Sequence, residues 1–318
     1  MQHDANPAWP ELPYGAWQDT RATLHLWTQV LGKIRLVQTP WLNHSWHVTL
    51  YVTARGLTTS PIPHGTRHFE MQFDFIDHVL DIIVSDGHAA RLALHPQTVA
   101  DFYGDVVTAL ADLGVPVDIR QHPCEIAGAM DFSQDRVHAA YDPEYARRFW
   151  QVLLQTDRVF KLFRTGFIGK CSPVHLFWGS FDLAVTRFSG RRAPPFAGTA
   201  PGVEPEVMRE AYSHEESSAG FWPGSDGTEF PAFYSYTYPV TEAFGRYPVQ
   251  PAGAYFSKTL GEFLLPYDVV RTSADPDATL LAFLQSTYEA AAVTANWDRA
   301  MLECPLGIPC IPREVPAP

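Results

Sequence analysis

A pattern that occurs twice places the strongest constraint on the fold: an amphipathic helix followed by segments with strand character. In the first half, apolar residues at helical spacing run over 17–36, and β-branched and aromatic residues are frequent over 43–57. In the second half, a helical pattern over 143–167 precedes SPVHLFWGSFDLAVTR at 172–187, which we interpret as a strand. The sequence therefore predicts an α+β fold built on mainly antiparallel sheet.

Further segments extend each half. Alternating apolar residues over 69–75 predict a strand with one buried face, and 115–120 has the composition of another strand. We expect helices over 98–113 and 279–297, and a loop rich in proline, glycine and serine over 193–227. Each half is then expected to run helix, strands, helix.

The two halves can be aligned on each other. TQVLGK at 28–33 matches TDRVFK at 156–161, which indicates an internal duplication with an interface between related halves. We expect three parts: an N-terminal α+β half over 1–135, a C-terminal α+β half over 136–303 packed on it as one unit, and a proline-rich tail over 304–318.

The charge balance limits the classes of partner. The chain has 35 acidic and 23 basic residues, a formal net charge of −12, which repels nucleic acid and anionic membranes. We therefore expect a small-molecule substrate or ligand, with no nucleic-acid or membrane partner. No apolar segment is long enough to span a bilayer, and the N-terminal sequence lacks a signal-peptide pattern. A cytoplasmic location is expected, and the oligomeric state is left open.

Common catalytic motifs are absent from the sequence. It contains no His-Glu-x-x-His, no phosphate-binding P-loop, no dinucleotide-binding glycine fingerprint and no Gly-x-Ser-x-Gly. We therefore expect no nucleotide cofactor. The four cysteines form no Cys-x-x-Cys pair. Cys171 could act as a nucleophile with His175 as its base, but the spacing favours the interpretation of Cys171 as a buried, inert thiol.

Histidines are the candidate metal ligands. His47 lies in NHSWHV, His175 in SPVHLF and His214 in SHEESS, and together they would suit a divalent metal such as Zn or Fe with an open position. His44 competes with His47 for this role, because residues three apart on a strand point to opposite faces. The alternative for this pair is one packing and one surface histidine. Glu215, beside His214, is the candidate ligand or catalytic base, with His175 as the second catalytic group.

Arginines and aromatic residues are the candidate substrate contacts. Arg187 and Arg191 flank Gly190, and guanidinium groups bind carboxylate or phosphate through two hydrogen bonds. The alternative is that they pair with some of the many acidic residues. Trp46, Trp178 and Trp222 would form the walls of an apolar pocket.

The motifs NHSWHV, GKCSPVHLFWGSFDLAVTRFSGRRAPP and AYSHEESSAGFWPG resemble a family of bacterial proteins known only as a domain of unknown function. The resemblance covers nearly the whole chain and implies that it forms one unit. It implies no activity or cofactor. In the family's pattern an aliphatic residue stands where this chain has Glu216, which implies that Glu215 is the functional residue of the pair.

The expected function is an enzyme acting on a small anionic, partly apolar substrate in an aromatic- and histidine-lined pocket between the halves. It could use a metal, or it could use His175 or His214 alone as the general acid or base. A small-molecule-binding protein without catalysis is the first alternative. A structural or interaction protein with an exposed apolar patch is the second.

Overall fold

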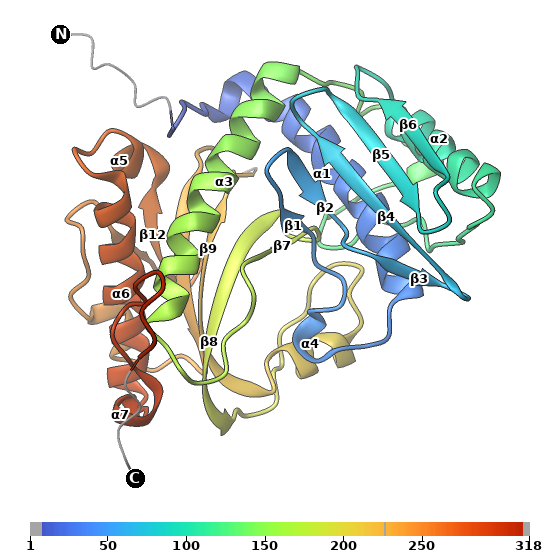
Figure 1. Cartoon of the computed structure of the whole chain (residues 1–318). Helices are drawn as coiled ribbons and strands as arrows, with labels where there is room; N and C mark the ends of the chain where they lie inside the picture. Colours follow the sequence, from blue (N-terminus) through green and yellow to red (C-terminus); the bar gives the residue numbers. More distant parts are fainter. Residues whose placement is uncertain (1–7, 226, 314–318) are drawn as a thin grey trace, which may run out of the picture.

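Two antiparallel sheets of six strands each, with helices packed against both, make up the part of the chain that the computed structural model describes, residues 8–225 and 227–313 (Figure 1). The expected α+β class with antiparallel sheet is confirmed, and each half runs helix, sheet, helix. The duplication itself stays a prediction. Among these residues, no helix is both long and apolar enough to cross a membrane.

The first sheet belongs to the N-terminal half. Its strands are β1 (Tyr51–Val52), β2 (Gly56–Thr58), β3 (Ile62–His64), β4 (Arg67–Asp74), β5 (Val79–Val84) and β6 (Ala89–Ala93). They follow the order β1-β2-β4-β5-β6, with β3 also paired to β4. The predicted buried face is confirmed, because Phe69, Met71, Phe73 and Phe75 are all in the core.

Helices α1 (Tyr14–Gln38) and α2 (Val99–Asp112) cover this buried face (Figure 1). The ring of Phe102 in α2 stacks on Trp27 of α1 at 4.6 Å and on Phe73 of β4 at 6.2 Å between centroids. Thr98 caps the start of α2 by accepting from the amide of Asp101, and the helix stops before a glycine with positive φ.

The second sheet belongs to the C-terminal half. Its strands are β7 (His175–Phe177), β8 (Asp182–Arg192), β9 (His214–Trp222), β10 (Ala232–Tyr238), β11 (Tyr255–Ser257) and β12 (Glu262–Pro266). They follow the order β11-β12-β10-β9-β8-β7. The helices of this half are α3 (Pro143–Thr165), α4 (Pro205–Ala211), α5 (Tyr267–Arg271), α6 (Pro276–Thr294) and α7 (Arg299–Leu302). The long helices α3 and α6 pack on one face of the sheet, and α4 lies on the other side (Figure 1).

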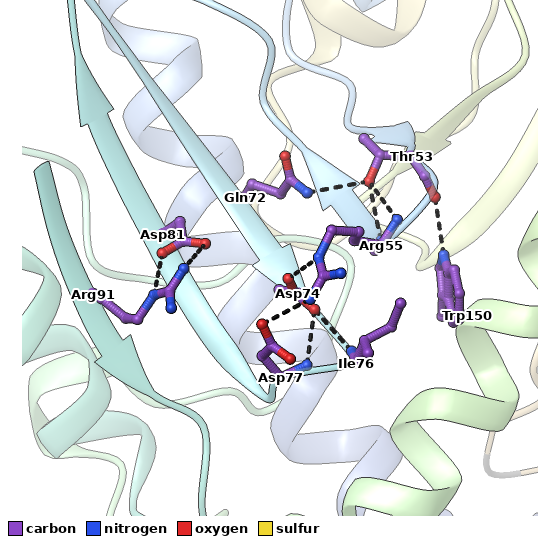
Figure 2. A network of polar contacts seen from close by, with 10 residues as sticks. Thr53, Arg55, Gln72, Asp74, Ile76, Asp77, Asp81, Arg91 and Trp150 are labelled. Carbon is purple, nitrogen blue, oxygen red and sulfur yellow. Dashed lines mark hydrogen bonds and ion pairs between the residues drawn. The ribbon is translucent and has the colours of Figure 1, made fainter. Parts of the chain in front are cut away.

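The halves meet edge to edge. The amide of Leu50, just before β1, donates to the carbonyl of Leu176 in β7 at 2.9 Å, and the reverse bond is 2.8 Å. Trp150 of α3 adds a side-chain link by donating from Nε1 to the carbonyl of Thr53 at 3.0 Å (Figure 2). These bonds join the two sheets directly, and one cluster of buried apolar side chains extends through both halves.

Four predictions on local structure were wrong. The segment 43–57 is a strand only at its end, because His44 and Ser45 have φ of 58° and 56°, which a strand cannot contain. No strand forms over 115–120. The predicted loop contains α4 and the central strand β9. The segment 172–187 is a hairpin, with a turn between β7 and β8 rather than one strand.

A buried carboxylate holds the turn that leads from β4 to β5 (Figure 2). Asp74 is 2% exposed, accepts from the amides of Ile76 and Asp77, and forms an ion pair with Arg55. Burial alone would raise its pKa, but these hydrogen bonds and the Arg55 charge outweigh burial, and the pKa of Asp74 is lowered. The ionised carboxylate is therefore part of the stable fold.

We expect Asp74→Asn to lower the free energy of unfolding at pH 7 by about 1–3 kcal/mol, because it leaves a buried network incomplete. A depressed pKa means that the contribution is present above the unfolded value of 3.8 and is lost as the pH falls. The deficit of the variant should therefore shrink in acid, as measured by urea unfolding. Asp81→Asn is the matched control, since its pair with the exposed Arg91 is worth less than about 1 kcal/mol. Equal losses in both variants would contradict this account.

Candidate functional site

A cavity of about 560 Å³ lies on the face of the second sheet that α3 and α6 leave uncovered. Its other walls come from α1, from the segment 41–48 and from α4. The cavity therefore sits between the two halves, beside the Leu50–Leu176 junction. Its size suits a small organic molecule.

Strand alternation decides which side chains reach this cavity. Successive residues of a strand point to opposite faces, and the register keeps even-numbered residues of β8, β9, β10 and β12 on the cavity side. The cavity-lining residues of these strands are Asp182, Ala184, Thr186, Phe188, Glu216, Ser218, Trp222, Tyr234, Tyr236 and Glu262. Their odd-numbered neighbours, such as Leu183, Phe221 and Phe233, pack into the core.

Aromatic rings contribute to the cavity walls both on the sheet and on the segments that face it. The rings that line the cavity are Trp41, Trp46, Trp178, Trp222, Phe177, Phe188, Tyr212, Tyr234 and Tyr236. Trp178 is fixed from behind, because its Nε1 donates to the carbonyl of Val48 at 2.7 Å and its indole packs on Gly32, where a Cβ would overlap the ring. The walls are therefore rigid on the α1 side, and apolar ligand surface can be buried there.

One end of the cavity is built around Asp182. This carboxylate is 6% exposed and accepts hydrogen bonds from the hydroxyls of Ser180 and Tyr234. Burial raises its pKa, while the two hydroxyls oppose that shift by stabilising the charged form. Asp182 therefore supplies a fixed carboxylate whose two oxygens are each held by a donor.

Glu125 and Glu262 lie beside this carboxylate. Burial raises the pKa of each to about 7, and the negative charge of Asp182 adds to the effect in both cases. Glu125 faces the open cavity and keeps an exposed surface there, while the surrounding protein limits its hydration. Glu125 and Glu262 therefore change protonation near neutral pH, and both feel the charge of Asp182, whose oxygens accept from two hydroxyl groups.

Glu216 occupies the other end. It is 5% exposed, and burial raises its pKa to about 8, although the Tyr236 hydroxyl and the Lys170 charge act in the opposite direction. Tyr212 and Tyr236 connect the two ends, with their hydroxyl oxygens 3.4 Å apart. At neutral pH the Glu216 carboxyl is therefore mostly protonated and can donate a hydrogen bond.

Helix α4 closes the cavity near Glu216 through contacts with 41–48. His44 donates from Nδ1 to the carbonyl of Ala211 at 2.7 Å, and its Nε2 accepts from Lys170 at 2.8 Å. Trp41 donates from Nε1 to Glu210 at 2.6 Å. Burial lowers the pKa of His44, and the Lys170 charge adds to this, so the imidazole is neutral and serves both contacts.

The predicted tryptophans and the predicted arginines have different positions. Trp46, Trp178 and Trp222 all line the cavity. Arg187 and Arg191 do not, because Arg187 lies on the helix side, with its guanidinium 3.5 Å above the ring centre of Phe163. Arg191 donates to Glu215 at 2.8 Å and to the carbonyl of Ala295 at 2.7 Å. Arg191 therefore pairs with an acidic residue, which was the alternative given for it, whereas Arg187 packs on aromatic rings and has no acidic partner among the described residues.

Glu215 points away from the cavity for the same reason. It accepts from Ser189 at 2.9 Å and pairs with Arg191, while its neighbour Glu216 faces the cavity. The prediction favoured Glu215 because the family resemblance implied an aliphatic residue at position 216, and the expected loop gave no alternation that would separate the two side chains. In β9 the two glutamates are on opposite faces.

The predicted metal ligands do not assemble into one group. His214 lies near His44, with ring centroids 5.9 Å apart, and Trp46 lies next to both His44 and His175. His47 lies against Leu42, with Nδ1 3.2 Å from its amide nitrogen. Within residues 8–225 and 227–313 no three His, Cys, Asp or Glu side chains are close enough to hold a metal ion. The role of His47, His175 and His214 as ligands stays a prediction.

His175 is enclosed by aromatic rings. It is fully buried, with Phe177 at 4.6 Å and Tyr51 at 6.3 Å between ring centroids. Burial lowers its pKa to about 3, and the charges of Arg35 and Arg164 add to this. Neither ring nitrogen has a hydrogen-bond partner among the described residues.

Residues 9–304 match the family described as "Family of unknown function (DUF5996)". The chain belongs to this family. The match covers both sheets and the residues that line the cavity between them. Neither the curated proteins nor the solved structures give a match to this chain.

Several cavity residues were missed by the sequence analysis. Asp182, Tyr234 and Tyr236 were read only as parts of strands, although the alternation in FYSYTY places both tyrosines on one face. Lys33 and Glu125 carry no local motif. Their role depends on α1 and the segment before α3 approaching the second sheet, which no spacing in the sequence shows.

We expect His175→Phe to leave the free energy of unfolding unchanged or to raise it by up to about 2 kcal/mol, because it replaces an unpartnered buried polar group by an apolar ring. His44→Phe is the matched control and should destabilise by about 1–3 kcal/mol, since both ring nitrogens of His44 have partners. Urea unfolding at pH 7 measures both. A larger loss in His175→Phe, together with loss of bound metal, would contradict the apolar role and favour the predicted ligand role.

Proposed function

We propose that the chain is an enzyme that performs general acid–base chemistry on a small, partly apolar molecule in the cavity between the halves. The observation that carries the proposal is the group of Asp182, Glu125 and Glu262 at one end of an aromatic-walled cavity. A carboxyl group with a pKa near the working pH is available both as acid and as base. Such groups gather at active sites because burial and like charge are needed to shift them.

Each member of the group has a distinct part in this proposal. Glu125, exposed to the cavity, is the group that takes or gives the proton, and Glu262 provides the same chemistry from β12. Asp182 is a positioning residue, because its charge keeps the pKa of both glutamates near 7. Tyr234 and Ser180 hold that charge in place.

The lining favours an uncharged or cationic substrate rather than the anionic one expected from the arginines. Five acidic side chains line the cavity, against Lys33 and Arg120 as basic ones, and Arg120 already pairs with Glu204 at 3.4 Å. An anion would lie close to Asp182 in a poorly hydrated space, which is costly. Aromatic faces attract cations and pack on apolar groups, so both remaining classes fit the walls.

A metal-dependent reaction stays a prediction from the sequence. The proposed acid–base chemistry is supported by carboxyl groups that line the same cavity and by the effect of the Asp182 charge on the pKa of Glu125 and Glu262. Within the described residues, no three His, Cys, Asp or Glu side chains form a metal-binding group. Binding without catalysis would need no carboxyl groups that titrate near neutrality, so the glutamates are what favours an enzyme.

The proposal can be tested without knowing the substrate. 5-Nitrobenzisoxazole is a neutral aromatic probe that opens when a base removes its ring proton, and the product is followed by absorbance. We expect the protein to accelerate this reaction with a rate that rises with pH through about 7, as Glu125 loses its proton. Glu125→Gln should lower the rate at least about 100-fold. Asp182→Asn should move the midpoint of the pH profile to lower pH, because the neighbouring charge is removed.

Two controls make this result specific. Glu206→Gln, at an exposed residue that does not line the cavity and pairs with Arg209, should leave the rate and its pH profile unchanged. Benzamide should inhibit by occupying the cavity, and benzoate, its anion of similar shape, should inhibit at least about ten-fold more weakly. A rate that is equal in wild type and Glu125→Gln/Glu262→Gln would contradict the proposed chemistry. Tighter binding of benzoate would contradict the proposed substrate charge.

A further inference from the structure

Lys33 is an amine in the cavity that the acid–base proposal leaves unused. It lies on α1, is 6% exposed and is among the residues that line the cavity. Its Nζ is 5.9 Å from the ring centre of Trp178, which is itself fixed by Val48 and Gly32. The amine is therefore held against an aromatic wall rather than extended into solvent.

The lysine lacks the partner that a buried ammonium normally has. Across the described residues, no carboxylate oxygen lies within 4.0 Å of its Nζ and no acceptor forms a hydrogen bond with it. Burial lowers the pKa of Lys33, and the charge of Arg120 adds to this, with the Cys124 thiol acting in the opposite direction. A desolvated, unpaired lysine loses its proton more readily and becomes a nucleophile.

The other three lysines of the chain differ from Lys33 in this respect. Lys161 pairs with Asp157 at 2.6 Å, Lys170 donates to His44 at 2.8 Å, and Lys258 lies next to β11 on the surface. None of them lines the cavity. The chain therefore contains one lysine that is buried, unpaired and open to a ligand, and three internal comparisons.

An acid that can assist a reaction at Lys33 lies close by. Glu125 directly follows Cys124 in the chain, and the Cys124 thiol feels the charges of both Lys33 and Glu125. In the proposed acid–base chemistry, Glu125 is the residue that transfers the proton. Cys124 stays protonated at neutral pH, because burial raises its pKa to about 11. An amine and an acid that titrates near neutrality are thus present on the same wall.

We propose that Lys33 forms an imine with a small, partly aromatic aldehyde or ketone bound in the cavity. This rests on the proposed function and names its substrate class as a carbonyl compound. The nitrogen lone pair forms the new C–N bond, and the C=O pair of electrons moves to the oxygen. Two protons leave the nitrogen and depart with that oxygen as water, so the amine and the carbonyl compound give an imine and one water. Glu125 carries one of these protons to the departing oxygen.

The test uses benzaldehyde, a neutral aromatic carbonyl probe, with the full-length protein at pH 7. Cyanoborohydride reduces any imine to a stable benzyl amine, and peptide mass spectrometry locates it among the four lysines. We expect the adduct to form at Lys33 at least about ten-fold faster than at Lys161, Lys170 or Lys258, because Lys33 is desolvated, unpaired and lines the cavity that holds the probe. Benzamide should slow the reaction at Lys33 and leave the other lysines unaffected.

Variants separate this inference from the proposed function. Lys33→Arg keeps the charge and should remove the fast adduct, while Lys161→Arg should not. If Lys33→Arg fails to fold, the distribution of label in the wild-type protein decides alone.

Equal labelling of the four lysines, or labelling of Lys33 that benzamide does not slow, would overturn the inference. If the Glu125-dependent reaction of nitrobenzisoxazole is then intact, only the imine fails. A specific Lys33 adduct without that reaction would instead contradict the acid–base proposal.

Discussion

Side-chain alternation in the second sheet is the constraint on which the candidate site depends. The helices α3 and α6 cover one face, so the odd-numbered side chains of β8, β9 and β10 form core with them. The even-numbered side chains then have to line a space that no helix fills, and Asp182, Glu216 and Tyr234 lie there. A shift of one residue in register would bury these carboxyl groups against α3 and α6 and expose phenylalanines to the cavity. The register that builds the core therefore also places the polar groups.

The junction between the halves turns this open face into a cavity. Paired hydrogen bonds between Leu50 and Leu176 fix the first sheet against the edge of the second, which places α1 across the open face. The walls that result are aromatic and poorly hydrated, so the charge of Asp182 acts strongly on Glu125 and Glu262. Burying several acidic groups in one place is unfavourable for stability, and such sites persist where function requires them. The cavity thus combines a stable core on one side with carboxyl groups of shifted pKa on the other.

The sequence predicted the elements better than the site. Helical spacing located the long helices, and the alternation at 69–75 located the buried face of the first sheet. The site depends on strand limits that composition does not reveal. The serine- and glycine-rich β9 was expected to be a loop, so the strand alternation that separates Glu215 from Glu216 was not used. Arg187 was assigned to a substrate although it lies on the helix side. His44 and Ser45 adopt left-handed conformations that turn a predicted strand into the cavity wall.

The central claim is that the cavity keeps carboxyl groups protonated near neutral pH. Infrared spectroscopy of the folded protein measures this directly, because a protonated carboxyl absorbs separately from a carboxylate. The account predicts a protonated-carboxyl band at about pH 6, because that pH is one unit below the pKa of about 7 of Glu125 and Glu262. The band should disappear as the pH rises past about 8, the pKa of Glu216. The band should be weaker in Asp182→Asn at the same pH, because the neighbouring charge is gone. A wild-type protein with no such band at about pH 6 would show that the cavity carboxyl groups are ordinary and would contradict the account.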